Sequence, residues 1–284
     1  MDILGHVPFV VPPPVKYLVT NADDFGFDPA VNAAVIQAHT TGILTSTSLL
    51  VTGPAVDEAI ELARQYPRLG VGLHLCLVQG RSALTGAAFP DSVIKITGNF
   101  EAELRAQIEK FLAAGLCPTH LDSHMHTHMH PRVLPVVIRL AREYRIRWVR
   151  APHEPFRYSA GKLVTRLARW PVFTVLGRRA SRKLRNAGLR TPDRGVGVLH
   201  PGQLTEGFLV NYLQHMPTGV TEIFFHPATE SNNTLHVCQP NYQHAGELQA
   251  LCSPTARKLI EESGIKLVNF SDLTAATIGD NLPV

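Results

Sequence analysis

Short apolar runs alternate with stretches of helical periodicity along most of the chain. In the helical stretches, apolar residues recur every three or four positions. One of them opens with Pro29 and ends at Gly42, an order typical of a helix start and stop. The predicted strands cover residues 17–21, 43–51, 70–78, 119–124, 146–150, 220–227 and 265–270. The predicted helices cover residues 29–42, 56–66, 101–115, 131–144, 203–215 and 245–263.

This repeated order of strand, loop and helix favours a parallel α/β architecture. A (β/α) barrel, closed or deformed, suits 284 residues best, and its active site would lie at the C-terminal ends of the strands. An open doubly wound sheet is the alternative, but no GxGxxG motif follows the first strand. We therefore predict a single domain over residues 1–284.

The composition is that of a globular protein, with 45% hydrophobic and 18% charged residues. No apolar run approaches the ~18 residues of a membrane span, and the N-terminus lacks the pattern of a secretory signal. The four cysteines show neither a CxxC motif nor a framework spacing, which indicates a reducing compartment. These features predict a cytoplasmic protein.

The charge is unevenly distributed although the net charge is only +4. Ten of the 27 Lys and Arg residues, and no acidic residue, lie between Arg157 and Pro192. We interpret residues 157–192 as a basic, insertion-like segment, most simply a solvated helical insertion on the barrel rim. Nucleic-acid binding is disfavoured because only Trp170 and Phe173 are close enough to stack on bases.

Polar side chains follow several of the predicted strands. NADDFG carries Asp23 and Asp24, GLHL carries His74, and EIFFHP carries His226. Each has a plainer interpretation as a turn, a core histidine or a strand end. Together, and at corresponding ends of parallel strands, they predict a metal site, because one carboxylate and two imidazoles form an open ligand set for a divalent ion.

The segment HLDSHMHTHMHP contains five histidines in eleven positions, His120, His124, His126, His128 and His130. In an extended segment, alternate side chains share a face, so the last four would point the same way. A catalytic ion takes about three protein ligands, so at most one or two of these histidines can bind it. The others would orient ligands, contact substrate or face solvent.

Five motifs carry a family resemblance: NADDFG, TSTSLLV, GLHL, THLDSHMHTHMHP and FFHPA resemble, in this order, those of the YdjC-like carbohydrate deacetylases. The resemblance covers roughly residues 16–150 and 220–270. APHEPF (151–156) and EIFFHPATE look most like the hopanoid-biosynthesis-associated members. This resemblance to the hopanoid-associated members implies removal of the acetyl group from the N-acetylglucosaminyl head group of a hopanoid lipid. Other members act on chitooligosaccharides, which is the alternative.

The resemblance also implies roles for individual residues. It makes Asp24, His74 and His124 the ligands of one divalent ion, zinc or magnesium, with Asp23 as base and His226 as acid. Of the remaining site residues, Asp122, His126 and His128 are expected to orient ligands or contact the sugar. His130 is expected to be structural, and His120 has no assigned role. Since neighbouring residues of a strand point to opposite faces, both aspartates can serve the site only if NADDFG has left strand geometry.

A lipid-linked substrate changes the interpretation of the basic segment. The implied partners are an N-acetylated glycolipid or sugar and, through residues 163–190, the anionic inner face of a membrane. A homo-oligomer is compatible with the sequence, and nucleic acid is not an expected partner. The rival hypothesis from a different class is a non-catalytic carbohydrate or nucleic-acid binder.

Overall fold

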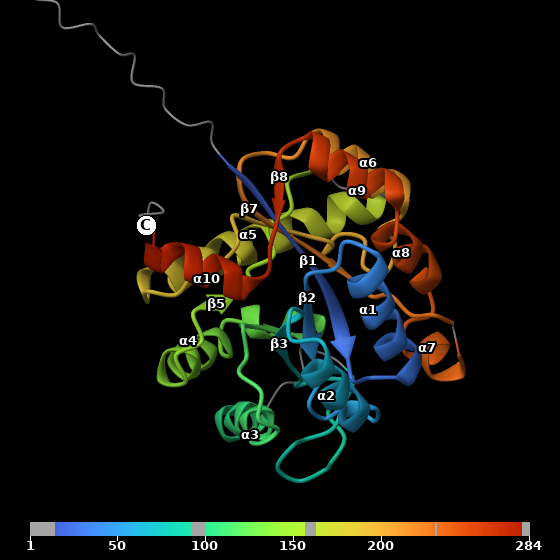
Figure 1. Ribbon diagram of the computed structural model, residues 1–284. Coiled ribbons are helices and arrows are strands. Elements are labelled where there is room, and N and C mark those ends of the chain that lie inside the picture. Colours follow the sequence, from blue (N-terminus) through green and yellow to red (C-terminus); the bar gives the residue numbers. More distant parts are fainter. Residues whose placement is uncertain (1–14, 92–99, 157–162, 231, 280–284) are drawn as a thin grey trace, which may run out of the picture.

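The computed structural model describes residues 15–91, 100–156, 163–230 and 232–279. One parallel sheet with the strand order β5-β4-β3-β2-β1-β7-β6 curls into a half-barrel, and β8 pairs with the first residues of β1 (Figure 1). This architecture confirms the predicted deformed (β/α) barrel. The strands are β1 (Lys16–Phe25), β2 (Ser46–Leu49), β3 (Gly70–Leu75), β4 (His120–Ser123), β5 (Trp148–Val149), β6 (Arg194–Val196), β7 (Gly219–Phe225) and β8 (Ile265–Leu267).

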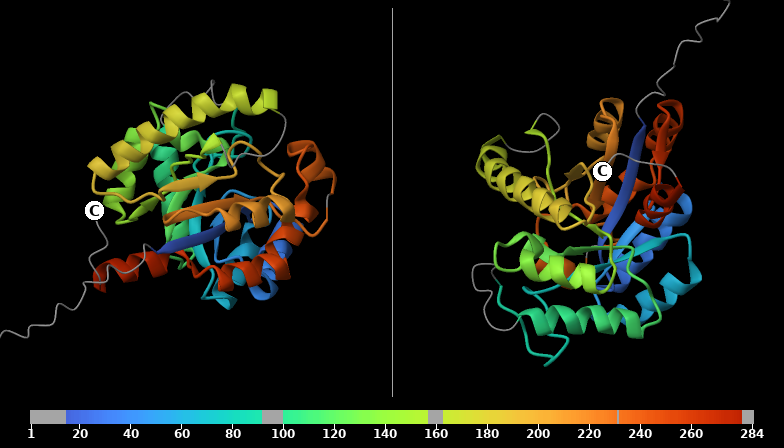
Figure 2. Two further views of the ribbon diagram at one scale, coloured as in Figure 1. Left: turned by 90° about the horizontal axis from the view of Figure 1, so that it is seen from above. Right: turned by 90° about the vertical axis from the view of Figure 1, so that its left-hand side faces the viewer.

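Helices surround the curled sheet (Figures 1 and 2). They are α1 (Pro29–Thr41), α2 (Val56–Gln65), α3 (Phe100–Ala113), η2 (His124–Met129), α4 (Leu134–Glu143), α5 (Leu163–Asn186), α6 (Glu206–Gln214), α7 (Asn233–Cys238), α8 (His244–Leu251), α9 (Pro254–Glu262) and α10 (Phe270–Gly279). None of the helices within the described ranges has the length and apolar character that a bilayer crossing requires.

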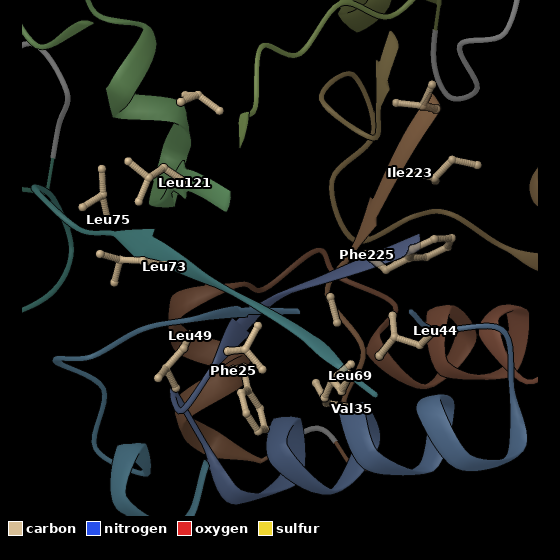
Figure 3. Packing of buried hydrophobic residues seen from close by; sticks show 14 of the residues in the cluster. Phe25, Val35, Leu44, Leu49, Leu69, Leu73, Leu75, Leu121, Ile223 and Phe225 are labelled. Atoms are coloured by element: carbon tan, nitrogen blue, oxygen red, sulfur yellow. The ribbon is translucent and has the colours of Figure 1, made fainter. Parts of the chain in front are cut away.

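The main hydrophobic core lies between the sheet and these helices (Figure 3). Leu49, Leu73 and Leu121 come from three neighbouring strands and are fully buried, and Val35 of α1 packs into the same cluster. Burial of each such side chain stabilises the fold by roughly 1.5–3 kcal/mol. Because side chains alternate along a strand, the residues on either side of each of these leucines point to the opposite face of the sheet.

The inner face of the curled sheet is polar near its middle. His120 and Asp122, which flank Leu121 in β4, are fully buried and both contact the Ser48 hydroxyl. Gly72 leaves space for the His120 ring, because a Cβ at this position would lie 2.2 Å from the ring. Buried polar groups of this kind are costly unless they are paired, so the barrel interior is built as a hydrogen-bonded network.

An apolar cluster closes the barrel beneath this network. Val19, Trp148, Phe270 and Leu273 form a separate buried cluster, and the centres of the Phe270 and His120 rings lie 4.2 Å apart. Phe270 and Leu273 both come from α10, an element that the sequence pattern did not predict. The polar interior therefore opens toward the carboxyl ends of the strands.

The predicted helix over residues 245–263 is wrong in one respect, because the structure has two helices there. α8 ends at Leu251 and α9 begins at Pro254. Proline lacks the N–H that a continuous helix would need, and the Ser253 side chain instead caps α9 by accepting the N–H of Ala256. Strand β6 was also missed, because three residues are too short to show alternation.

The basic segment forms the crossover between the two edge strands of the sheet. Its residues 163–186 are α5, which connects β5 to β6 and lies along one flank of the barrel (Figure 2). Residues 157–162 lie outside the described ranges. Arg190 pairs with Trp148 of β5, and Glu154 accepts the N–H groups of Gly197 and Leu199 beyond β6. The backbone around α5 thus bridges the gap between the two edges.

Candidate active site

A distortion at the end of β1 brings two adjacent aspartates to the site. The pairing of β1 with β2 is irregular between Ala22 and Phe25, and Asp24 has a φ of 65°. Aspartate tolerates this left-handed conformation better than most residues. Gly26 follows with a φ of 92°. The backbone therefore leaves regular strand geometry at NADDFG. This departure allows Asp23 and Asp24, although adjacent, to face the same site.

Asp24, His74 and His124 form a compact set of three candidate ligands. Asp24 Oδ1 lies 3.3 Å from His74 Nε2 and 3.1 Å from His124 Nδ1. One ligand atom from each residue falls within 4.8 Å of the others, which is a spacing that could hold a metal ion. The three come from β1, β3 and the start of η2, at the carboxyl ends of the strands.

The electrostatics of this triad favour a cation. Burial would raise the pKa of the Asp24 carboxyl, but His124 and His74 hold it well below its usual value. Burial would lower the pKa of His74, but Asp122, whose Oδ1 lies 2.8 Å from Nδ1, helps to raise it to about 10. The carboxylates that favour a proton on His74 would equally favour a divalent cation at its Nε2. Asp122 also fixes the orientation of the ring, as partners of metal-binding histidines do.

Arg150 is the central residue that the sequence analysis missed. It is fully buried, and its guanidinium makes two 2.7 Å hydrogen bonds to the two carboxylate oxygens of Asp23. It also lies 2.7 Å from Asp122 Oδ2 and donates from Nε to Glu222 at 2.9 Å. The guanidinium lies 4.3 Å from the centre of the Phe224 ring. One cation thus holds three carboxylates in fixed positions.

The balance of charge around Arg150 is negative. Burial opposes ionisation of Asp122, but Arg150 and His74 hold its pKa far below the usual range. Burial raises the pKa of Glu222 to about 7, and Arg150 limits this rise. Arg150 cannot neutralise all of the carboxylates that surround it. A bound divalent ion would complete the charge balance.

His226 follows β7, the strand that pairs with β1, and lies close to Asp23. Its Nε2 is 3.9 Å from Asp23 Oδ2. Its backbone is fixed because its N–H donates to Glu247 and its carbonyl oxygen lies 2.7 Å from His244 Nδ1. The ring packs edge-on against Tyr242, with centroids 4.9 Å apart. Burial lowers the pKa of His226, and Asp23 opposes this shift.

The histidine run does not continue the strand. After β4, residues 124–129 form a short 3₁₀ segment that is kinked at Met125 and His126, both of which have a φ of 53°. The alternation expected for an extended segment therefore does not apply. His124 points to Asp24, whereas His126 is partly buried with its ring edge-on to Phe173 and Phe224.

Two other histidines of the run support the structure around the site. His128 contacts the Ser123 hydroxyl at 2.6 Å and the Arg150 carbonyl oxygen at 2.8 Å. His120 contacts the Ser48 hydroxyl at 3.1 Å. Burial lowers the pKa of both imidazoles to about 4, so they are neutral at pH 7. His128 thereby helps to place the backbone of the residue that holds Asp23.

Two glutamines also contact the triad and were missed. Gln239 donates from Nε2 to Asp24 Oδ2 at 2.8 Å, and Gln79 Oε1 lies 3.3 Å from His124 Nε2. Both come from loops whose sequence has no distinguishing pattern. Glu222 did leave a signal, since it is the one charged residue in the β7 segment VTEIFF, whereas Arg150 did not stand out because Arg147 lies in the same short segment.

Comparison with known proteins places these observations in a family. The model described as YdjC-like protein matches residues 17–262. A carbohydrate deacetylase of Brevibacillus brevis is 33% identical over 269 residues, with 90% of this chain and 99% of the relative covered. A carbohydrate deacetylase of Geobacillus stearothermophilus is 32% identical over 272 residues, with 90% and 98% covered.

The fold agrees with this relationship. One solved structure, described as that of a candidate cellobiose-phosphate cleavage protein of Enterococcus faecalis V583, superposes with a TM-score of 0.70 at 29% identity. The match covers 91% of this chain and 99% of the solved one. The family match extends from β1 to the end of α9 and includes every strand that contributes to the site. The chain therefore belongs to the YdjC-like protein family.

Proposed function

We propose that the protein is a metal-dependent deacetylase that hydrolyses the N-acetyl group of an acetamido sugar. The observation that carries this proposal is the Asp24, His74 and His124 triad, flanked by Asp23 and His226 at the barrel mouth. The relatives that are called carbohydrate deacetylases span nearly the whole chain and support the substrate class.

The residues present fit a resident divalent ion. Asp24, His74 and His124 would hold it, and Gln239 and Asp122 would fix two of these ligands. Two imidazoles and one carboxylate suit zinc, and magnesium is the alternative. When bound, the ion would lower the pKa of a coordinated water and polarise the acetyl carbonyl.

Asp23 and His226 supply the proton transfers. Asp23, held at both oxygens by Arg150, accepts a proton from the water whose oxygen bonds to the acetyl carbon. The C–N bond then breaks only if the nitrogen gains a proton, because an amide anion is a poor leaving group. His226 donates that proton, and the Asp23 carboxylate, whose Oδ2 lies 3.9 Å from His226 Nε2, favours the imidazolium form that carries it. The products are acetate and the free amine of the sugar.

Replacing Asp24, His74 or His124 with Ala is expected to lower both the metal content and the rate of acetate release. Each change removes one of only three protein ligands. Elemental analysis of purified protein, coupled to acetate release with and without chelator, measures both effects. His130→Ala, in the same histidine-rich segment, is the matched control. Full metal content in all three variants would refute the assignment.

For the substrate, we propose the N-acetylglucosaminyl head group of a hopanoid lipid. This choice rests on the resemblance of APHEPF and EIFFHPATE to the hopanoid-associated members of the family. We expect kcat/KM for acetate release to be at least about tenfold higher on the glycolipid than on soluble chitooligosaccharides, a difference of about 1.4 kcal/mol. A preference for the soluble oligomers would instead favour the alternative substrate.

A lipid-linked substrate also suggests peripheral contact with an anionic membrane through residues 163–190. Trp170 and Phe173 of α5 pack on the barrel, whereas Val172 and Val175 of the same helix are exposed, at 55% and 65%. Basic residues follow on the same helix. Each Lys or Arg near an anionic leaflet contributes about 1 kcal/mol to binding.

We therefore expect salt-sensitive flotation with anionic vesicles. Neutralising Arg178, Arg179, Arg182, Lys183 and Arg185 together should weaken it by at least about tenfold while acetate release from a short soluble substrate survives. A wild-type protein that stays unbound at low salt, or a neutralised variant that floats equally well, would rule out this contact.

A further inference from the structure

A polar hollow lies on the surface, separate from the proposed catalytic residues. It has a volume of about 350 Å³ and is formed by the C-terminal half of α5, the segment after β5 and the residue before β6. Its lining consists of His153, Arg178, Ser181, Arg182, Arg185, Asn186 and Asp193. None of these residues has a role in the proposed reaction.

The arginines of this hollow share one face of α5. Arg178, Arg182 and Arg185 are spaced by four and three residues, which places neighbours on the same side of a helix. The Arg178 Nε donates to His153 Nε2 at 3.2 Å, so this ring nitrogen acts as an acceptor. Burial lowers the pKa of His153, and the positive charge of the nearby Arg178 lowers it further. The imidazole is therefore neutral and does not add to the charge.

The single carboxylate of the hollow is already engaged. Asp193 Oδ1 accepts from Arg185 at 3.0 Å, and its Oδ2 accepts from the Val220 N–H at 2.9 Å. Within the described ranges, no ion pair forms between Arg178 or Arg182 and a carboxylate. The hollow thus contains three positive guanidinium groups. The negative charges that oppose them are one carboxylate and the negative end of the α5 dipole, which amounts to about half a charge. The hollow keeps a positive charge.

We propose that this hollow binds a phosphate group, either free or as part of a lipid head group. Several guanidinium groups facing one space match the three or more oxygens of a phosphate, which accept charge-assisted hydrogen bonds. The Ser181 hydroxyl and the Asn186 amide add neutral donors. This site is independent of the proposed catalytic function, because it shares no residue with it.

The chain provides a matched pair of variants for the test. Arg178→Gln/Arg182→Gln removes two charges that line the hollow. Arg179→Gln/Lys183→Gln removes two charges from the same helix that do not line it. Binding of inorganic phosphate to the full chain is measured by titration calorimetry at fixed ionic strength. Flotation with phosphatidic acid vesicles, against pure phosphatidylcholine vesicles, gives the lipid arm.

We expect the Arg178/Arg182 variant to lose at least about tenfold in affinity for phosphate or for phosphatidic acid vesicles. In calorimetry the Arg179/Lys183 variant should stay within about twofold of the wild type, and in flotation it should lose less affinity than the Arg178/Arg182 variant. Loss confined to the vesicle arm identifies a lipid phosphate, and loss in calorimetry identifies a free phosphate. Equal losses in both variants would indicate diffuse charge attraction and overturn the proposal. So would a wild type that binds neither probe.

Acetate release from a soluble substrate separates this proposal from the proposed function. Both double variants are expected to retain wild-type release, since the substitutions lie outside the catalytic residues. If the wild type releases no acetate yet binds phosphate in the hollow, the phosphate site stands and the deacetylase assignment fails.

Discussion

Asp23→Asn and His226→Ala are each expected to keep their metal while turnover falls by about 10² or more, the usual contribution of a general acid or base. The amide introduced by Asp23→Asn retains the shape of the carboxylate but does not accept a proton at neutral pH. His226→Ala leaves the departing nitrogen without its donor, although the backbone of this position stays bonded to Glu247 and His244.

The measurement is kcat for acetate release, together with metal content and a thermal melt of each variant. His130→Ala serves as the control, since His130 lies in the histidine-rich segment but outside both the triad and the proton-transfer pair. If either folded, metal-loaded variant turns over at the wild-type rate, that residue has no part in the reaction.

Arg150→Met is expected to lower the free energy of unfolding by about 3–5 kcal/mol, the usual effect of removing one partner from a buried ion pair. Methionine fills much of the volume but leaves Asp23, Asp122 and Glu222 close together without a cation. These carboxylates are buried, so water cannot compensate for the loss.

Urea unfolding followed by circular dichroism measures this effect. Arg147→Met, three residues earlier at an exposed position, is the control and should change stability by less than about 0.5 kcal/mol. Adding Glu222→Gln to Arg150→Met should recover part of the loss because one uncompensated carboxylate is removed. A loss of under about 1 kcal/mol in Arg150→Met would contradict the role assigned to this guanidinium.

Much of the fold and of the ligand set was predictable because parallel strands end at the same side of a barrel. The strand-end positions predicted a site that includes Asp24 and His74, the family resemblance added His124, and the structure brings the three together. Asp122 was expected to orient a ligand, but Arg150 and Gln239 were not found, because they reach the site through contacts distant in sequence. The turn over residues 124–129 was missed because left-handed residues such as Met125 carry no compositional signal.

Asp122 connects two parts of the site, the proposed metal triad and the guanidinium of Arg150. It bonds His74 through one oxygen and Arg150 through the other, and Arg150 in turn holds Asp23. One carboxylate thus connects the proposed metal triad with the proposed base, and we expect the two to be linked thermodynamically. Because such coupling is reciprocal, an ion that orders His74 also tightens the placement of Asp23, and substitutions at Arg150 should weaken metal affinity from a distance. Metal uptake would then act as an assembly step that completes the base as well as the ion site.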